Sequence, residues 1–407
     1  MKELFIIAWR NLWRNKKRTL ITMASVFFAV FLALLMRTMQ YGTYNMMERD
    51  AVKNSTGYIQ VHADGYWNKK TINNTFQSSP DLEDTIRELE NVTSITPRLE
   101  SFALGSSGDL TKGVAVIGTE PERENHMTGL KKRVVEGAYF GDAKNEVLLA
   151  KKLAEYLELG AGDTLVLLSQ GYHGATAAGK YLIRGILDFS IPMMNSEMVY
   201  MKLEDAQYFY AAPGHLSSLS IMLRDPGRLE ETTARLKKIL GPDYEVMTWK
   251  QMMTALVQGI QSDNISGLFM LGILYLVVAF GIFGTMLMMT MERKKEFAVM
   301  VSVGMQRSAL AFILLVETLC IAFAGVITGV AVSLPVIAYF HENPIELTGA
   351  AAEAMIDFNA EPILPFSLDA FIFANQALVV LILTLLAIIY PVYFVFRFNL
   401  MRAFRGK

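Results

Sequence analysis

Four long apolar segments constrain this chain more than any other feature. They span residues 19–36, 265–291, 308–340 and 370–396. A helix needs about 20 mostly apolar residues to cross the hydrocarbon layer of a bilayer. The second and fourth segments contain no charged residue, and the third contains only Glu317. The sequence therefore predicts a membrane protein with four transmembrane helices.

The first apolar segment is predicted to be retained rather than cleaved as a signal peptide. Its basic leader, residues 1–18, is long, and no small-residue cleavage site follows the apolar run. The leader also places Trp9 and Trp13 beside basic residues, which is typical of an amphipathic segment lying along a membrane surface.

Basic residues near the spans predict how the helices are oriented. Residues 1–18, 292–307 and 397–407 are rich in Lys and Arg, whereas residues 341–369 carry acidic residues and no Lys or Arg. Short loops rich in Lys and Arg stay in the cytoplasm. We therefore predict that both termini and the 292–307 segment are cytoplasmic, and that residues 341–369 and 37–264 lie outside.

Residues 37–264 are long enough for a large domain with its own core. Alternating stretches such as "TGYIQVHADGYW" and "EVLLA" are typical of strands, and "RLEETTARLKKIL" is typical of a helix. The pattern predicts an α+β domain in two lobes, the second at about residues 100–195. The predicted fold class is an α-helical membrane protein with four transmembrane helices and a large α+β extracytoplasmic domain inserted between helices 1 and 2.

One stretch, "GATAAGKY" at residues 174–181, comes close to a phosphate-binding loop. Such a loop needs Ser or Thr after its Lys to bind magnesium, and a helix leading away from it. Here Tyr181 follows Lys180, and the next residues are strand-like. We predict instead two strands joined by a long, flexible and exposed Gly/Ala-rich tip. This tip is either a connector or a periplasmic docking loop, with Tyr172, His173 and Lys180 as its candidate residues.

The composition argues against several classes of function. A formal net charge of −1 gives no reason to expect a nucleic-acid partner. The one cysteine, Cys320, and five scattered histidines predict neither a disulfide within the chain nor a metal site. No nucleophile–base pair or paired carboxylates stand out. We expect no catalytic residue and no cofactor in this chain, so that any energy from ATP comes from a separate subunit.

The cytoplasmic segment at 292–307 combines the charged cluster "ERKKE" with apolar residues and Gly304. A short helix of this kind between two spans is either a solvated connector or a knob that fits a cleft on a motor subunit. The residues alone leave both interpretations open.

Several residues inside the spans stand out by their chemistry. Glu317 is an intramembrane acid, which normally faces protein or water, and we expect it to tie spans together. Gly325 and Gly329 form a G-x-x-x-G pattern that allows close helix packing, within one subunit or across a dimer. The first span suits either lipid or the acyl chains of a substrate. Its candidate substrate contacts are Phe27, Phe28, Phe31 and Met36.

Residues 291–332 resemble the permease superfamily that includes the MacB exporter, the FtsX division protein and the lipoprotein-releasing permeases. The similarity rests on "ERKKEFAV", "SVGMQRS", Glu317 and "AGVITGVAV", together with the opening "AWRNLWRNKKRTLIT". In the outer domain, "EVLLAKKLAEYLELGAGDTLVLLS" and "YLIRGILDFSIPMMNSEMVYMKLEDAQ" are similar to the LolC/LolE-like, lipoprotein-releasing branch.

The resemblance implies that the helix at 292–304 is a coupling helix that contacts an ATP-binding subunit. The implied coupling residues are Glu292, Arg293, Lys294, Lys295, Glu296, Phe297, Met300 and Gly304. The resemblance also implies two ABC ATPase subunits holding ATP and Mg, and a second permease, identical or similar. These subunits would assemble in the bacterial inner membrane.

A periplasmic lipoprotein carrier is a further partner that the resemblance suggests. One permease type of the branch carries a hook for such a carrier where this chain has its 170–181 hairpin. The tip here lacks the proline expected of that type.

The family offers three alternative functions. The expected one is extraction of lipoproteins from the outer leaflet of the inner membrane, with substrate entering between the first and second spans of partner subunits. The alternatives are MacB-type efflux of amphipathic drugs or peptides and FtsX-like regulation of a periplasmic hydrolase. The large outer domain disfavours the third, since the regulators tend to have smaller ones.

Overall fold

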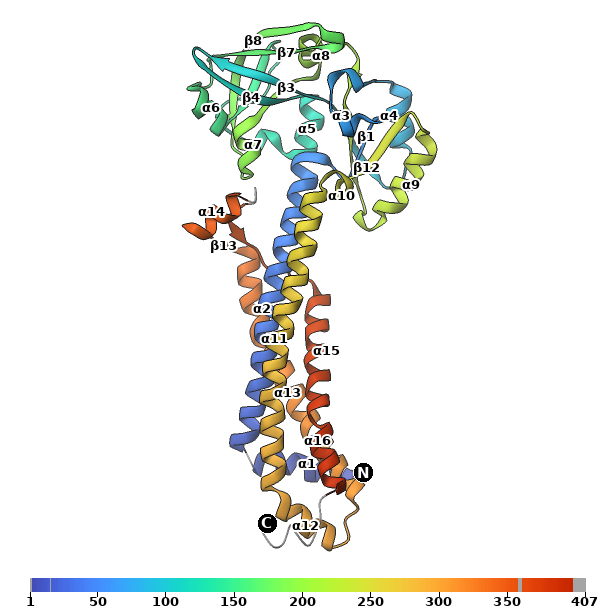
Figure 1. The fold of residues 1–407 in the computed structure, drawn as a ribbon, viewed down its shortest axis with the longest axis vertical. Coiled ribbons are helices and arrows are strands. Elements are labelled where there is room, and N and C mark those ends of the chain that lie inside the picture. The colour runs from blue at the N-terminus through green and yellow to red at the C-terminus, as the bar shows by residue number, and fades with distance from the viewer. Residues whose placement is uncertain (1, 15, 358–360, 398–407) are drawn as a thin grey trace. The chain divides into compact units, whose positions relative to one another are not determined.

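The computed structural model describes residues 2–14, 16–357 and 361–397, which form two compact units (Figure 1). The helical unit comprises Met1–Asn45, Gly259–Glu346 and Ile363–Lys407, and the sheet unit comprises Met46–Gln258 and Leu347–Pro362. Nearly all of the predicted basic tail at 397–407 lies outside the described residues.

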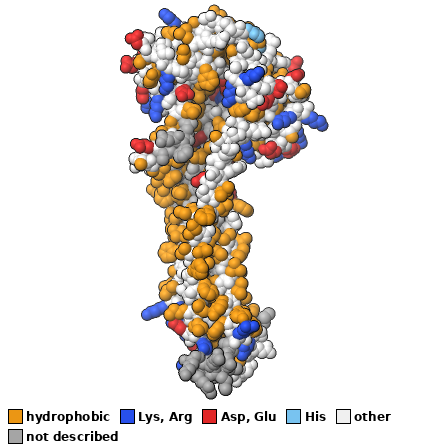
Figure 2. All heavy atoms as spheres, in the orientation of Figure 1, with side chains coloured by type: hydrophobic (Ala, Val, Ile, Leu, Met, Phe, Trp, Pro, Cys, Tyr) orange, Lys and Arg blue, Asp and Glu red, His pale blue; other side chains and the backbone are white. Residues whose placement is uncertain are grey.

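Long helices dominate the helical unit. They are α1 (Lys2–Arg14), α2 (Lys16–Ala51), α11 (Thr254–Glu292), α12 (Lys294–Ser302), α13 (Arg307–Glu342), α15 (Ala370–Ala387) and α16 (Ile389–Arg397). Two short strands, β13 (Ile345–Glu346) and β14 (Ile363–Leu364), pair beside them. Among the described residues, four stretches are long and apolar enough to cross a membrane: Lys16–Thr56, Thr254–Glu292, Arg307–Glu342 and Ala370–Arg397. The prediction of four apolar spans is confirmed, and hydrophobic side chains cover these helices in Figure 2.

Helix α13 is the centre of the helical unit. Its most apolar stretch is 61% buried, against 17% for that of α11, and it packs against α1, α15 and α16. Gly325 and Gly329 bring it against α2. A Cβ added at these glycines would lie 2.7 Å from the Cβ of Val26 and 2.9 Å from the Cβ of Val30. Only a residue without a side chain allows so close an approach, so the G-x-x-x-G pattern packs here within one chain.

The fourth span is interrupted near its end. Helix α15 ends at Ala387 and α16 begins at Ile389. Pro391 explains the break, because its nitrogen carries no hydrogen and cannot donate to the carbonyl of Ala387, four residues earlier.

One large mixed sheet organises the sheet unit. Its strands are β1 (Ile59–Ala63), β3 (Val92–Ser107), β4 (Leu110–Thr119), β5 (Val134–Gly137), β6 (Glu146–Ala150), β7 (Thr164–Gln170), β8 (Thr176–Leu187), β9 (Met198–Lys202), β11 (Ser218–Leu223) and β12 (Tyr244–Thr248). Neighbours follow the order β12–β1–β11–β3–β4–β9–β6–β8–β5, and β7 pairs with β3 and β8. The β4–β9 and β6–β8 pairs are parallel. A separate small pair joins β2 (Phe76–Gln77) to β10 (His215–Leu216).

Short helices pack against this sheet, and most of them connect its strands along the chain. They are α3 (Tyr66–Lys69), α4 (Pro80–Arg87), α5 (Pro121–Thr128), α6 (Lys151–Leu157), α7 (Pro192–Glu197), α8 (Leu203–Phe209), α9 (Leu229–Leu240) and α10 (Trp249–Met252), with α14 (Ala350–Asp357) in the same unit. Two hydrophobic clusters result, one containing Leu148 and Tyr200 and the other containing Ile59 and Leu236. The predicted α+β class is confirmed.

A buried ion pair joins three elements of the sheet unit. Arg98 of β3 is 1% exposed and Glu124 of α5 is 0% exposed. The Arg98 guanidinium donates to both carboxylate oxygens of Glu124, at 2.9 and 2.6 Å. It also donates to the carbonyl of Ser55 in the π-helix η1 (Val52–Thr56). Bidentate, charge-assisted bonds of this kind are strong and directional, so Arg98 fixes α5 beside η1.

His62 on β1 is fully buried and makes the sheet unit sensitive to acid. Its Nδ1–H donates to the carbonyl of Ser217 at 2.9 Å, and its Nε2 has no partner among the described residues. Burial lowers the pKa of His62 below its ordinary value of 6.5. The unfolded chain therefore takes up a proton as the pH falls through about 6.5, whereas the native His62 takes one up only at a lower pH.

We expect His62 to lower the stability of the sheet unit as the pH falls below about 6.5. Urea unfolding of the full chain, followed at several pH values, measures this loss. The variant His62→Phe keeps the ring and removes the titrating group, so the slope with pH should be smaller in it. Equal slopes in the two proteins would contradict the role given to His62.

Candidate coupling site

The segment between α11 and α13 folds as one short helix and a tight turn. Arg293 leaves the path of α11 with φ −86° and ψ 6°, and α12 follows with Glu296 in its first turn, where a negative charge stabilises a helix. After Ser302 the chain turns through Gly304 at φ +106°, a conformation that L side chains rarely adopt. Helix α13 then starts at Arg307.

One side of α12 is buried in the helical unit. Phe297 and Ala298 are both 0% exposed and pack in a cluster with apolar residues of α13, of α16 and of the break before α16. The other members of the cluster are Leu310, Leu314, Ile388 and Val395. Burying a phenylalanine side chain stabilises by about 1.5–3 kcal/mol, so Phe297 anchors α12 to the spans.

Glu317 is the hub of a polar cluster that fixes the start of α12. Its carboxylate accepts from Nη1 of Arg293 at 2.6 Å and from Nδ2 of Asn11 at 2.7 Å. Arg293 is 4% exposed and Glu317 is 2% exposed. A buried charge is stable only when it is paired and hydrogen-bonded. These bonds therefore tie α1, the start of α12 and α13 together.

Two further ion pairs surround this cluster. Arg14 of α1 pairs with Glu296, and Arg18 of α2 pairs with Glu292. Both pairs are partly exposed, so each contributes little to stability, about 0–1 kcal/mol. Their effect is to orient the ends of α1 and α2 around α12.

The other side of α12 is exposed, and we call it the outer face of α12. It consists of Lys295, Val299 and Ser302 of α12 together with Val303, the residue directly after the helix, and their spacing of four, three and one places them on one side. Val299 is 50% exposed and Val303 is 83% exposed. Exposed valines lie here beside a lysine, and Phe297 and Arg293 fix the opposite side of the helix. Such a surface is suited to docking a protein.

The structure separates the predicted coupling residues into four groups. Arg293 and Phe297 are buried, and Lys294 and Met300 are half-buried. Glu292 and Glu296 form the ion pairs described above, whereas Lys295 and Gly304 are exposed. Sequence reasoning missed Val299, Ser302 and Val303. The four-residue spacing from Lys295 through Val299 to Val303 indicates that these residues share one side of the helix, but it does not say whether that side is exposed.

The 170–181 hairpin differs from the expected long flexible tip. Strand β8 begins at Thr176, so the Gly/Ala-rich residues extend the strand instead of the loop. Gly179 is needed there because an added Cβ would lie 2.7 Å from Cε2 of Tyr181. Tyr172 is half-buried, its N–H donates to the carbonyl of Tyr210 at 2.7 Å, and its ring contacts His215. His173 and Lys180 remain exposed.

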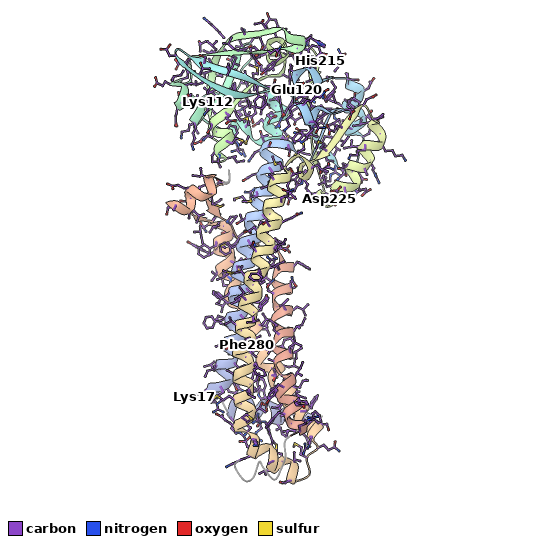
Figure 3. All side chains as sticks on the ribbon, viewed as in Figure 1. Lys17, Lys112, Glu120, His215, Asp225 and Phe280 are labelled. Carbon is purple, nitrogen blue, oxygen red and sulfur yellow. The ribbon has the colours of Figure 1, made fainter. Side chains whose placement is uncertain are left out.

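The candidate substrate contacts lie on α2 with mixed exposure. Phe28 is 55% exposed, while Phe27, Phe31 and Met36 are half-buried. Phe27 stacks on Phe31 with ring centroids 5.8 Å apart. Helix α11 is more exposed: Phe280, labelled in Figure 3, is 67% exposed.

A second polar cluster, which sequence reasoning missed, joins α2 to α11. Arg37 is 5% exposed, and its Nη1 donates to Gln40 at 2.6 Å and to Asn264 at 3.1 Å. Gln40 and Tyr44 in turn donate to the carboxylate of Asp263 at 3.0 and 2.6 Å. The sequence does contain a sign of this cluster, because the charged residue Arg37 directly follows the first apolar run.

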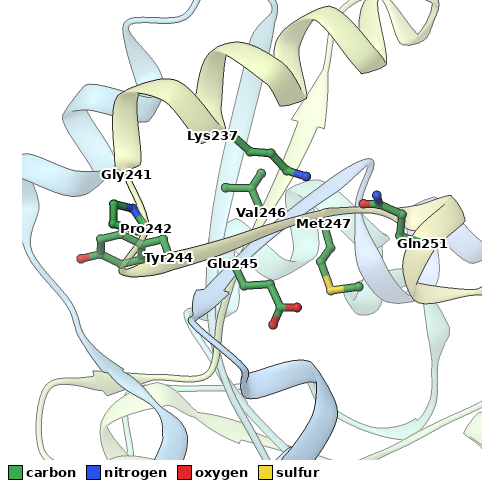
Figure 4. A pocket seen from close by; sticks show the side chains of 8 residues that line it. All are labelled: Lys237, Gly241, Pro242, Tyr244, Glu245, Val246, Met247 and Gln251. Atoms are coloured by element: carbon green, nitrogen blue, oxygen red, sulfur yellow. The ribbon is translucent and has the colours of Figure 1, made fainter.

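One open hollow lies in the sheet unit beside the edge strand β12, with a volume of about 670 Å³ (Figure 4). Its lining mixes one lysine, Lys237, and one glutamate, Glu245, with apolar residues. Glu245 already accepts from the backbone N–H of Trp67 at 3.2 Å. Within the described ranges, no group of three or more His, Cys, Asp or Glu could hold a metal ion.

Comparison with known families accounts for nearly the whole chain. Residues 19–239 match the model of the MacB-like periplasmic core domain, and residues 268–400 match the FtsX-like permease C-terminal model. The chain belongs to the MacB/FtsX-like ABC transporter permeases. Members of this family work with ATPase subunits.

Individual relatives of this permease are distant. The lipoprotein-releasing system transmembrane protein LolE of Haemophilus influenzae is 20% identical over 342 residues, which cover 82% of this permease and 82% of LolE. An ABC transporter permease protein of Mycobacterium tuberculosis is 23% identical over 247 residues. That match covers 58% of this permease and only 27% of the longer relative.

Among solved structures, the periplasmic region of MacB from Actinobacillus actinomycetemcomitans is similar to part of this permease. The match covers 52% of this chain and 97% of the MacB region, with 13% identity and a TM-score of 0.36.

Proposed function

We propose that this permease extracts lipoproteins from the outer leaflet of the bacterial inner membrane, using ATP hydrolysed by a separate subunit. The observation that carries this proposal is the match to LolE, which extends over 82% of both chains. If the two proteins shared only one domain, the match would cover only a part of each chain. The permease itself would be non-catalytic and would hold no cofactor.

The proposed topology places the sheet unit in the periplasm, inserted between the first and second spans. The charge pattern supports this arrangement, because residues 1–18 and 292–307 are basic whereas residues 341–369 carry no Lys or Arg. Both termini and α12 would then face the cytoplasm, where ATP is available.

The outer face of α12 is the proposed contact with the ATPase. Its exposed valines, Val299 and Val303, would enter a cleft of the ATPase, while Phe297 and the Glu317 cluster transmit the movement to the spans. The proposed complex contains two ATPase copies, which bind ATP and Mg, and a second permease, identical or similar. ATP-driven closure of the ATPases would move the periplasmic domains.

Acyl chains of the lipoprotein would contact the apolar surfaces of the first and second spans. The exposure of Phe28 and Phe280 supports this, because both aromatic rings face outward from the helical unit. We leave a periplasmic carrier out of the proposed complex, since Tyr172 of the hairpin packs against its own unit.

Reconstitution tests the proposal against its alternatives. The permease, its ATPase and its partner permease are placed in liposomes that carry a radiolabelled lipoprotein, and a soluble acceptor is added outside. We expect ATP-dependent transfer of the lipoprotein to the aqueous phase. Transport of an amphipathic dye without lipoprotein transfer would favour MacB-type efflux. ATP-dependent activation of a periplasmic hydrolase without either transfer would favour the FtsX-like role.

A further inference from the structure

Two hollows in the sheet unit adjoin each other beside η1 and α5. The first, of about 670 Å³, is lined by Lys53, Asn125, Thr128, Lys131 and Lys132 among others. The second, of about 350 Å³, is lined by Arg49, Lys53, Thr128 and Arg133 among others. Because Lys53 and Thr128 line both, the two hollows form one continuous surface, which we call the basic hollow.

The basic hollow carries a surplus of positive charge. Five basic side chains line it, and the acidic residues in the same lining are Asp50 and Glu361. Lys53, Lys131 and Lys132 are exposed, and no ion pair joins any of them to a carboxylate within the described part of the chain. Here the basic residues come from α2, η1 and the 3₁₀ turn η3 (Leu130–Arg133).

Contacts of Arg98 and Arg133 fix the elements that form the basic hollow. The Arg98 ion pair binds Glu124 of α5 and the carbonyl of Ser55 in η1, so these two walls cannot separate without breaking it. Arg133 is fixed as well, because its Nη2 donates to Oδ1 of Asn54 at 2.8 Å and its guanidinium lies 5.4 Å from the Phe189 ring centroid.

The turn between α5 and η3 is fixed in the same way. The backbone N–H of Lys131 donates to Oδ1 of Asn125 at 3.0 Å, and Gly129 turns the chain at φ +69°. The backbone that carries Lys131 and the guanidinium of Arg133 are therefore positioned before any ligand arrives, which reduces the entropy lost on binding.

We propose that the basic hollow binds a phosphate group. Its Lys and Arg side chains only donate hydrogen bonds, and they approach from several sides. A phosphate monoester offers three terminal oxygens and up to two charges, and a phosphodiester offers two terminal oxygens and one charge on a tetrahedral phosphorus, whereas a carboxylate offers two oxygens in one plane. Lys supplies point charges and Arg a planar fork for phosphate oxygens. The phosphate could be the headgroup of an anionic phospholipid or a free phosphate ester.

Binding of two probes to the full-length permease in neutral detergent tests this proposal. One probe is dihexanoyl phosphatidylglycerol below its micelle concentration, and the other is glycerol 3-phosphate, both followed by ³¹P NMR titration. The triple variant Lys53→Gln, Lys131→Gln, Lys132→Gln should bind about 100-fold more weakly, since each lysine near an anionic headgroup contributes on the order of 1 kcal/mol and about 1.4 kcal/mol corresponds to a factor of ten. Added salt should weaken binding to the wild type.

A matched control removes three exposed lysines elsewhere on the sheet unit, Lys144→Gln, Lys152→Gln and Lys238→Gln, and should bind like the wild type. If both probes bind and compete, the hollow recognises the phosphate group without the acyl chains. If only the lipid binds, binding of the phosphate group also requires the acyl chains. Either result supports the proposal. Equal affinity in the wild type and the triple variant overturns it. So does failure of both probes to bind, or binding of polyglutamate in their place.

Discussion

Replacing Val299 and Val303 by glutamate should abolish co-purification of the ATPase subunit while the permease still inserts and folds. These side chains are 50% and 83% exposed, so the substitutions leave the interior of the helical unit unchanged. Each buried valine contributes about 1.5–3 kcal/mol to an interface, and a glutamate forced into the same place adds the cost of an unpaired charge. We therefore expect the affinity for the ATPase to fall at least about 100-fold.

The control for this experiment is the double variant Val135→Glu, Ile239→Glu. Both side chains belong to the sheet unit and are exposed to similar degrees, 57% and 49%, so it matches the test variant in chemistry and in net charge. It should retain the ATPase in a pull-down. Retention by the α12 variant would show that the ATPase docks elsewhere.

Phe297→Asp is a poor test of docking by comparison. Phe297 is 0% exposed, so an aspartate there would disrupt the cluster that anchors α12, and loss of the ATPase would follow from misfolding. This distinction comes from the structure, because the sequence places Phe297 within the same short helix as Val299 and Val303.

Glu317→Ala should destabilise the helical unit more than any exposed substitution. The change removes the carboxylate that pairs with Arg293 at 2.6 Å and leaves a buried guanidinium without its main partner. Breaking a buried ion pair in this way costs about 3–5 kcal/mol. Thermal unfolding in detergent, together with protease cleavage within 292–307, measures the loss of stability and the release of α12.

A double variant separates this charge effect from a simple packing defect. Arg293→Met with Glu317→Leu replaces both members of the pair by apolar residues of similar size, which is often neutral or stabilising. We expect it to recover most of the stability lost in Glu317→Ala. If the double variant is as unstable as the single one, the pair does not act through compensated charge.

The spans and the domain class could be predicted from sequence because both depend on local patterns. A charge-free run of sufficient length has few alternatives to a membrane helix, since lipid offers the backbone no hydrogen bonds. Alternation of apolar and polar residues likewise indicates strands wherever one face is buried.

The exposed face of α12 could not be predicted in the same way. Phe297 and Val299 are apolar residues of α12 and Val303 directly follows it, yet the first is buried and the others are exposed. What decides between them is the position of Leu310 and Ile388, which lie far along the chain. Glu292 and Glu296 belong to the charged cluster of this segment, but their partners Arg18 and Arg14 are equally distant in sequence.

The 170–181 hairpin is a second case in which the local sequence pattern does not reveal the structure. A run of Gly and Ala is typical of a flexible loop, but in β8 the small residues make room for a neighbouring side chain. Gly179 leaves space for the Tyr181 ring, and Ala177 is buried opposite Ser169. The ring occupies that space only once the two strands have paired, so the local pattern could not reveal it.

The fit of Gly325 and Gly329 against Val26 and Val30 has a consequence for engineering. The first span cannot be transplanted from a relative on its own, because a bulkier residue at position 26 or 30 would collide with the backbone of the third span. Chimaeras of this permease should exchange the first and third spans as a pair. In evolution, residues 26 and 30 should co-vary with residues 325 and 329.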